Sequence, residues 1–587
     1  MRAQVKLYRQ GHDLMAKKFF VTVMHRGRAW VEYLVRWRIT TCLIAIAVAV
    51  YGVVLRVAGL GRSLWLDEAW VANSVATSSL AKMFYYKSWL QTSPPLFLVL
   101  VRETVAVFGL TNAALRAIPL LMGLLAMAVM FILARHLLLR RYALLATALF
   151  VLSPVAITYS RTLKQYSSEL AASTTILLVC IMFLGRPTTQ RFRLLVAIVA
   201  VGLLIAYAVA FVLPGIILVL FLFFSPSRSC CNPRGTANRA VWRGVVLATI
   251  AGGILIGEYI LFVLPNDPSL LRAHWGFVAS DRPSSLDESV IKESSFLAAS
   301  DSYELLEELP IPRPANGVEK RLILGAVGSI VGVGFALACL RFSKGRRRWL
   351  ELQALCVTPC LLLLIGDWFS WYPLTRRTSL FLLPFIVLLL ASSLQLMSYF
   401  LLSRFHKHWL KMLLDAAVLG VILLMLAGVV RRTPLAISKI PIEDIDSAVL
   451  FLRGHVQSGD VLWVHASCSE SFKLYARMRG WQGATVKYGQ TGWPCCARGV
   501  FNYTSSEKLV RDDFSSVIPD AFSGRVWLLY TNRFYHWQIL GVDEREIMKT
   551  ILREKGCSET QTPVFHNVGV SSFNCKEHVT KSGGGAP

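Results

Sequence analysis

Two adjacent carboxylates, Asp67 and Glu68, follow the first long apolar run of this 587-residue sequence. They lie in the segment GRSLWLDEAW, residues 61–70. A carboxylate that accepts the proton of a hydroxyl nucleophile acts as a general base. Acidic residues are also favoured in the first turn of a helix, so the pair by itself more often marks an ordinary helix N-terminus.

Cationic side chains recur at the ends of later apolar runs. Such residues snorkel to a membrane interface, or they hold a phosphate group and stabilise the charge that develops on it. The aromatic residues beside them serve equally as interface anchors or as parts of a substrate pocket. The cationic candidates are Arg116, Arg161, Lys164, Arg376 and Arg377, and the aromatic ones are Trp65, Tyr159 and Tyr166.

The elements that must position these residues are long apolar helices. Hydrophobic residues make up 55% of the chain, and its mean hydropathy is +0.52. About 20 apolar residues are needed to cross a hydrocarbon core of about 30 Å. The expected spans are 37–59, 113–135, 142–159, 166–185, 192–207, 208–225, 241–264, 321–341, 349–367, 379–397 and 411–431, with a weaker candidate at 94–110. The sequence therefore predicts a polytopic α-helical membrane protein with about 11–13 transmembrane helices.

The net charge of +27 would suggest a nucleic-acid partner in a soluble protein. Here the excess Lys and Arg lie in short loops, such as 186–193, 228–243 and 344–348. Short basic loops mark the cytoplasmic side, so no nucleic-acid partner is expected. This rule places the N-terminus inside and both ends of 60–112 outside. If 94–110 does not fully cross the membrane, the chain has eleven spans, which is the preferred count. If 94–110 does cross, a second crossing must accompany it within this region, and the count is thirteen.

The expected domains are a basic cytoplasmic segment 1–36, a transmembrane catalytic domain 37–431 and an extracytoplasmic α/β domain 432–587. The transmembrane domain includes two outer loops, 60–93 and 265–320. Strand and helix patterns alternate in the last domain, at 460–466, 469–478, 525–531 and 543–556. Disulfides are permitted there if the domain lies outside. His465 falls in a predicted strand, which favours a core role over a catalytic one.

Acids and cations on one membrane face have a chemical use. In a sugar linked to a lipid phosphate, the phosphate leaves as a stabilised anion, so no strong general acid is needed. Transfer requires a base for the acceptor hydroxyl and cations for the growing phosphate charge. One carboxylate and two or three Lys or Arg residues meet that requirement.

The order of the motifs resembles the GT-C membrane glycosyltransferases. The resemblance is closest to the branch of the protein O-mannosyltransferases and the aminoarabinose lipid A transferases. It covers about residues 37–431, and five motifs in order are fairly specific. They are Asp67–Glu68, Pro94–Pro95–Leu96, Arg116/Pro119/Gly123, Tyr159/Ser160/Lys164/Tyr166 and Arg377 to Pro384.

The resemblance implies an inverting transfer from a polyprenyl-phosphate sugar on the non-cytoplasmic face. The proposed base of the family maps to Asp67, and Glu68 would support it or contact the acceptor. The family often has Arg where Lys164 stands and Arg-Tyr at Arg377–Thr378, so the phosphate contacts are expected to differ. The aminoarabinose branch also has a lysine beside the entry of the second span. In this sequence the nearest lysine to that position is Lys87.

We therefore expect a membrane glycosyltransferase, specifically a hexosyl- or pentosyltransferase. Its partners would be membrane lipid, a polyprenyl-phosphate sugar and a glycan, lipid or protein acceptor. No cofactor and no metal are expected, because no second acidic cluster with ligand spacing lies near Asp67. The sequon at Asn502 has meaning only in a eukaryotic lumen. The lack of long insertions favours a bacterial inner membrane.

Three other functions stay open. A polyprenyl-lipid flippase or transporter usually shows intramembrane charges and internal repeats, and this chain has few such charges and no evident repeat. A receptor or scaffold that presents the C-terminal domain would tolerate substitution of the outer cations. A polysaccharide polymerase or ligase of another fold is the third alternative.

Overall fold

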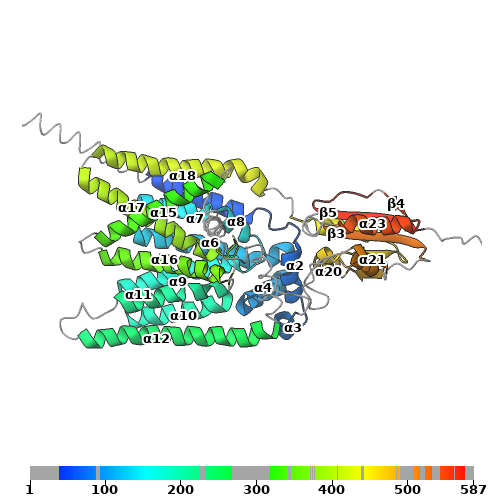
Figure 1. Cartoon of the computed structure of the whole chain (residues 1–587), viewed down its shortest axis with the longest axis horizontal. Coiled ribbons are helices and arrows are strands. Elements are labelled where there is room, and N and C mark those ends of the chain that lie inside the picture. The colour runs from blue at the N-terminus through cyan, green and yellow to red at the C-terminus, as the bar shows by residue number, and fades with distance from the viewer. Residues whose placement is uncertain are drawn as a thin grey trace, which may run out of the picture.

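The chain folds into a bundle of long helices and a smaller domain built on one sheet (Figure 1). The computed structural model describes residues 39–86, 93–223, 233–266, 317–340, 346–369, 372, 374–375, 377–405, 408–437, 442–483, 485–489, 507–515, 522–531, 543–560 and 562–575. The expected N-terminal segment 1–36 and most of the expected outer loop 265–320 lie outside these ranges.

Every apolar run expected to span overlaps a long helix of the bundle. These helices are Ile39–Val57, α6 (Ala117–Leu137), α7 (Arg140–Val151), α9 (Tyr166–Gly185), α10 (Thr189–Ile205), α11 (Leu213–Phe223), α12 (Pro233–Glu258), α15 (Gly317–Leu340), α16 (Arg346–Trp368), α17 (Leu383–Phe405) and α18 (His408–Ile437). Short turns of other helix types adjoin some of them, namely η1 (Tyr207–Phe211), η2 (Tyr259–Val263), η3 (Leu264–Asn266) and η4 (Leu380–Leu382).

Among the described residues, six helical segments are long and apolar enough to cross a membrane. They are Ile39–Val57, Ala117–Leu137, Tyr166–Gly185, Val241–Asn266, Trp349–Trp368 and Leu380–Ser403. Three shorter apolar segments accompany them, at Tyr207–Phe221, Ala326–Leu337 and Met412–Gly428. The chain is thus a polytopic α-helical membrane protein, as its composition predicts.

Two expected runs differ from the helices observed. The run 142–159 breaks in two, because Ser153 caps α8 (Pro154–Tyr159) through the backbone N–H of Ala156 and Pro154 begins that helix. The last run continues past residue 431, since α18 extends to Ile437.

The weak candidate at 94–110 forms α4 (Pro95–Phe108), which begins at a proline and has 14 residues. At 1.5 Å per residue the helix is about 21 Å long, short of the roughly 30 Å that a full crossing needs. Arg102 is half-buried and donates to the carbonyl oxygens of Val75 and Thr77. The length of α4 therefore agrees with the expectation that the segment 94–110 does not fully cross the membrane.

The C-terminal domain contains a mixed five-stranded sheet in the order β2-β1-β3-β5-β4. Strand β1 pairs in parallel with β2 and β3, and β5 is antiparallel to both β3 and β4. The strands are β1 (Val461–Val464), β2 (Thr485–Tyr488), β3 (Gly524–Thr531), β4 (Ser558–Thr560) and β5 (Val568–Cys575). The helices are α19 (Ile445–His455), η5 (Ala466–Cys468), α20 (Ser469–Met478), α21 (Glu507–Ser515) and α23 (Glu544–Glu554).

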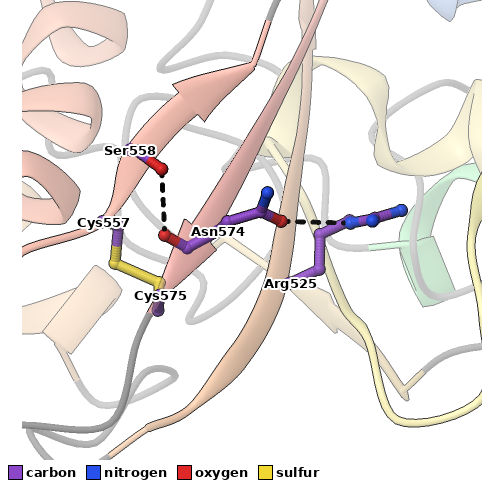
Figure 2. The surroundings of a disulfide bond; sticks show 5 residues. All are labelled: Arg525, Cys557, Ser558, Asn574 and Cys575. Carbon is purple, nitrogen blue, oxygen red and sulfur yellow. Dashed lines mark hydrogen bonds between the residues drawn. A yellow bond between two sulfur atoms is a disulfide. The ribbon is translucent and has the colours of Figure 1, made fainter.

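A disulfide between Cys557 and Cys575 joins the segment after α23 to the end of β5 (Figure 2). Beside it, the Asn574 side chain accepts a hydrogen bond from Arg525, and the Asn574 carbonyl accepts one from Ser558. Cys468 is buried and carries a free thiol. Two of the five cysteines expected in this domain therefore form a pair.

Candidate active site

The carboxylates Asp67 and Glu68 lie in the first turn of α2 (Leu66–Val75). This helix lies between the bundle and the C-terminal domain (Figure 1). Its N-cap residue, Trp65, makes no side-chain capping bond and is half-buried. Acids at this position satisfy the local preference of a helix N-terminus, so their separate contacts must show whether they do more.

Glu68 is buried in a two-pronged ion pair with Arg116. The Arg116 Nε atom donates to Glu68 Oε1 at 2.8 Å, and Nη2 donates to Oε2 at 2.6 Å. The other contacts of the guanidinium are with the carbonyl oxygens of Leu60, Arg62 and Ser63. Arg116 thus fixes the loop before α2, and this geometry does not favour the phosphate contact expected of it.

Glu68 also fixes the loop between α8 and α9. Its Oε1 atom accepts a hydrogen bond of 2.6 Å from the backbone N–H of Leu163. Only 2% of the Glu68 side chain is exposed. The next residue in that loop is Lys164, so this bond brings the lysine to the first turn of α2. The contacts of Glu68 therefore favour the expected support of Asp67 over the expected contact with the acceptor.

Asp67 meets two cations from distant parts of the chain. Its Oδ2 atom lies 3.3 Å from Arg377 Nη1 and 4.0 Å from Lys164 Nζ. The exposed fractions of the side chains are 14% for Asp67, 2% for Lys164 and 29% for Arg377. We call these three residues the Asp67 cluster. Asp67 and Arg377 are the two members that keep access to a ligand.

A local turn presents Arg377. The backbone N–H of Thr375 donates to Thr378 Oγ1 at 3.0 Å, and the N–H of Ser379 donates to the Thr375 carbonyl at 3.0 Å. Asp367 at the end of α16 accepts from the N–H of Leu374 at 2.8 Å. Thr378, where the related family often has tyrosine, thus closes the turn and leaves Arg377 to extend toward Asp67.

The environment changes the proton affinity of both cations. Burial lowers the pKa of Lys164 to about 8, against the opposing effect of the Asp67 carboxylate. Burial also acts to lower the pKa of Arg377, but the neighbouring Tyr166 and Asp67 raise it above its ordinary value. Arg377 therefore carries its charge at any physiological pH, whereas the charge of Lys164 depends on pH.

Arg161 lies apart from the Asp67 cluster, against the end of the first helix. It donates to the carbonyl oxygens of Leu55 at 3.4 Å and Ala58 at 3.3 Å. Burial lowers its pKa to about 10, and the positive charges of Arg62 and Arg116 act in the same direction. These contacts hold Arg161 to the backbone of the first span. They do not favour the phosphate contact expected of it.

Aromatic side chains adjoin the Asp67 cluster. Tyr159 and Tyr166 meet edge to face, with ring centroids 4.9 Å apart. Tyr372, which sequence reasoning did not select, lies near Tyr166 and Arg377 and meets Phe211 at 5.0 Å. The signal for it was its place in the WYP motif that precedes Arg377. Two further candidates, Lys87 and Arg376, lie outside the described residues.

The glycine of the motif order, Gly123, lies against Ser160. A Cβ atom at this position of α6 would lie 2.2 Å from Ser160 Oγ and 2.7 Å from Ser160 Cβ. Real Cβ contacts are not that close, so any larger residue would push Ser160 away. Because Ser160 begins the turn that holds Lys164, this close approach supports the geometry of the Asp67 cluster.

The C-terminal domain holds α2 at both ends through one helix, α20. Tyr475 Oη accepts a hydrogen bond of 2.6 Å from the backbone N–H of Leu64, just before α2. Glu470 accepts from Asn73 Nδ2 of α2 at 2.9 Å and from the Tyr86 hydroxyl at 2.9 Å. No motif in the sequence pointed to Tyr475 or Glu470, because contacts between domains leave no local pattern.

Within the described part of the chain, no three His, Cys, Asp or Glu residues form a group that could hold a metal ion. The expectation that no metal takes part is not tested by this geometry and stays a prediction.

The comparisons with known proteins agree with this architecture. Residues 92–251 match the family model for dolichyl-phosphate-mannose-protein mannosyltransferase. A comparison with curated protein sequences gave no significant match. The crystal structure of ArnT from Cupriavidus metallidurans bound to undecaprenyl phosphate is similar over 94% of this chain and 99% of that chain, with a TM-score of 0.51 and 13% identity.

The apo structure of the same protein is similar with a TM-score of 0.50 over 91% of this chain and 97% of that chain, again at 13% identity. At this identity the likeness concerns the fold. Together with the matched segment, it confirms the resemblance found in the sequence: this chain is a membrane protein with the fold of the GT-C glycosyltransferases.

Proposed function

We propose that the protein is an inverting glycosyltransferase that moves a sugar from a polyprenyl-phosphate donor to an acceptor hydroxyl. The observation that carries the proposal is the Asp67 cluster, in which a partly exposed carboxylate lies 3.3 Å from a partly exposed guanidinium. The matched family model is that of enzymes named for a lipid-phosphate sugar donor. ArnT, which shares the fold, was crystallised with undecaprenyl phosphate.

In the proposed reaction, Asp67 accepts the proton of the acceptor hydroxyl as its oxygen attacks the anomeric carbon of the sugar. The bond from that carbon to the phosphate oxygen breaks, and the polyprenyl phosphate leaves with the electron pair. Arg377 and Lys164 stabilise the charge that develops on the phosphate. A single displacement of this kind inverts the configuration of the anomeric carbon.

We also propose that the reaction takes place on the extracytoplasmic face of a bacterial inner membrane. The basic loops of the sequence favour an orientation with the C-terminal domain on that side. The Cys557–Cys575 disulfide supports this orientation, since disulfides persist in oxidising compartments. The acceptor would be a glycan, lipid or protein that reaches α2 from the side of the C-terminal domain.

The experiment is transfer from synthetic polyprenyl-phosphate sugars by the purified protein, with wild type beside Asp67→Asn. We expect wild type to release polyprenyl phosphate and the variant to lose at least about 100-fold in rate, since a general base contributes about 10²–10⁴. The thermal midpoint should be retained, because the substitution keeps the shape of the side chain. A folded protein that binds the lipid but releases no phosphate from any of several donors would favour the flippase alternative.

A further inference from the structure

Near the Asp67 cluster, one oxygen of a buried carboxylate has no hydrogen-bond partner among the described residues. Glu169 lies in the first turn of α9, and its relative exposure is 1%. Its Oε2 atom makes no hydrogen bond, and the described residues give it no ion pair. The hydroxyl of Ser173 on the same helix is also buried and without a hydrogen-bond partner.

Such a group is costly in a protein interior. Burying a carboxylate without a partner costs several kcal/mol, on the order of the net stability of a domain. Within a membrane-spanning helix there is no bulk water to relieve that cost. An unpaired acid within a membrane-spanning helix usually marks a functional site. Glu169 therefore calls for a partner that arrives from outside the chain.

The position of Glu169 shows where that partner would bind. Tyr166, Glu169 and Ser173 lie three and four residues apart on α9, so they share one face of the helix. Burial raises the pKa of Tyr372 well above its ordinary value, and the nearby Glu169 and Tyr166 raise it further, whereas Arg377 lowers it. Glu169 thus lies near Tyr372 and Tyr166, the two tyrosines that also interact with Arg377 of the Asp67 cluster.

The chemistry of these groups suits a sugar ring. A carboxylate and a serine hydroxyl accept hydrogen bonds from ring hydroxyls, and a hydroxyl that replaces the missing partner relieves the cost of burial. A site built to hydrogen-bond a substrate hydroxyl strongly rejects an analogue that lacks it. Arg377 and Lys164 next to this face would hold the phosphate. The sugar ring attached to that phosphate is then the part of the donor that Glu169 and Ser173 can reach.

We infer that Glu169 and Ser173 form the subsite that accepts hydrogen bonds from the hydroxyls of the donor sugar. The inference rests on the proposed function, because the lipid-phosphate donor comes from it. Glu169 is then a specificity-determining residue, and Asp67 remains the base. The energy of the sugar contacts offsets the cost of burying the unpaired carboxylate.

The test compares equilibrium binding of two probes, a short polyprenyl phosphate and the same lipid phosphate carrying a sugar. The proteins are wild type, Glu169→Gln, Ser173→Ala and the control Glu258→Gln. Glu258 at the end of α12 is also buried, and neither of its oxygens has a partner, but it lies near Tyr207 rather than near Tyr372. It therefore matches Glu169 in chemistry and differs in place.

We expect wild type and Glu258→Gln to bind the sugar-bearing lipid about tenfold more tightly than the bare lipid phosphate. Glu169→Gln should lose this preference and keep the affinity for the bare lipid, and Ser173→Ala should lose part of it. The thermal midpoint of ligand-free Glu169→Gln should equal or exceed that of wild type, since the unpaired charge is removed.

Three results would overturn the inference. In the first, Glu169→Gln keeps the preference for the sugar-bearing lipid. In the second, this variant loses affinity equally for both lipids. In the third, its ligand-free thermal midpoint falls below that of wild type. A wild-type protein that binds both lipids equally would also exclude a sugar subsite while leaving the phosphate site standing. A wild-type protein that binds neither lipid would instead refute the proposed function, and this inference with it.

Discussion

The Asp67 cluster of the bundle and a second polar cluster in the C-terminal domain have similar chemical groups in different environments. In the second, which we call the His465 cluster, His465 Nδ1 lies 2.7 Å from Ser467 Oγ and Nε2 lies 2.6 Å from Glu544 Oε2. All three residues are buried. In the Asp67 cluster the two contacts of the carboxylate are 3.3 Å and 4.0 Å, and Arg377 is 29% exposed.

The difference separates polar groups that are fully enclosed in the fold from polar groups that are partly exposed. The His465 cluster has the residue types of a hydrolytic triad, but its three side chains are buried and make short hydrogen bonds to one another. Ser467 also donates its backbone N–H to His465, so the histidine caps η5. The contacts of Asp67 with its two cations are longer, at 3.3 Å and 4.0 Å, and 14% of its side chain is exposed to a ligand. Four predictions test this contrast, from the largest effect to the smallest.

Arg377→Ala should lower kcat/KM for the lipid donor by about 100-fold, the usual loss when one preorganised donor is removed from a developing charge. Steady-state transfer with varied donor concentration measures the effect. The matched control is Arg479→Ala, which breaks a partly exposed ion pair with Asp446 in the C-terminal domain. Equal rates for Arg377→Ala and wild type would mean that the guanidinium does not meet the phosphate.

Glu544→Leu should destabilise the protein by about 1–3 kcal/mol, because it leaves a buried His465 nitrogen without a partner. The thermal midpoint in detergent measures this loss. Transfer per folded molecule should not change, since the His465 cluster touches no substrate in our proposal. A variant that folds normally but no longer transfers sugar would reverse the contrast and make the His465 cluster catalytic.

The pH dependence should report the charge of Lys164. Its pKa of about 8 means that the cation is present below that pH and is lost as the pH rises through it. Donor kcat/KM should then fall above pH 8, by up to about tenfold per unit if the charge is essential. In Lys164→Arg the fall should move to higher pH, because guanidinium keeps its proton. A profile that is identical in both proteins would assign the fall to another group.

The same shift has the opposite sign for stability. The folded pKa lies below the ordinary lysine value of about 10.4, so the fold favours the neutral form of Lys164. The contribution of this residue to stability therefore increases as the pH rises from about 8 to about 10, over the range in which donor binding weakens.

Ser467→Ala should have the smallest effect, a loss of about 1 kcal/mol or less with unchanged transfer. The serine hydroxyl bonds to His465 and accepts from Thr531 at 3.4 Å, so its removal costs these two hydrogen bonds. The loss stays small because the second bond is long and His465 Nδ1 keeps the bond from the Ser467 backbone N–H. Thermal unfolding and transfer are again measured together. A fall in transfer without a fall in stability would show that the hydroxyl reacts.

Sequence reasoning found the parts of the Asp67 cluster but not all of their roles. It selected Asp67, Lys164 and Arg377 from motifs that lie far apart in the chain, and the structure brings them together. It also selected Arg116 for the donor phosphate and Glu68 as a support for Asp67 or a contact for the acceptor, and the structure joins these two side chains in an ion pair. A charge at a helix end looks the same in sequence whether it faces a ligand or another side chain.

The sequence by itself determined that the chain crosses a membrane many times and ends in an α/β domain. Long apolar runs and alternating patterns are local signals, and burial of a helix in lipid depends mainly on its own composition. Only the tertiary structure decided that α20 of the C-terminal domain holds α2, and that Glu169 is buried with one oxygen unbonded among the described residues. These features depend on which side chains meet across hundreds of residues, and a hydrogen bond between distant segments leaves no periodic trace in the chain.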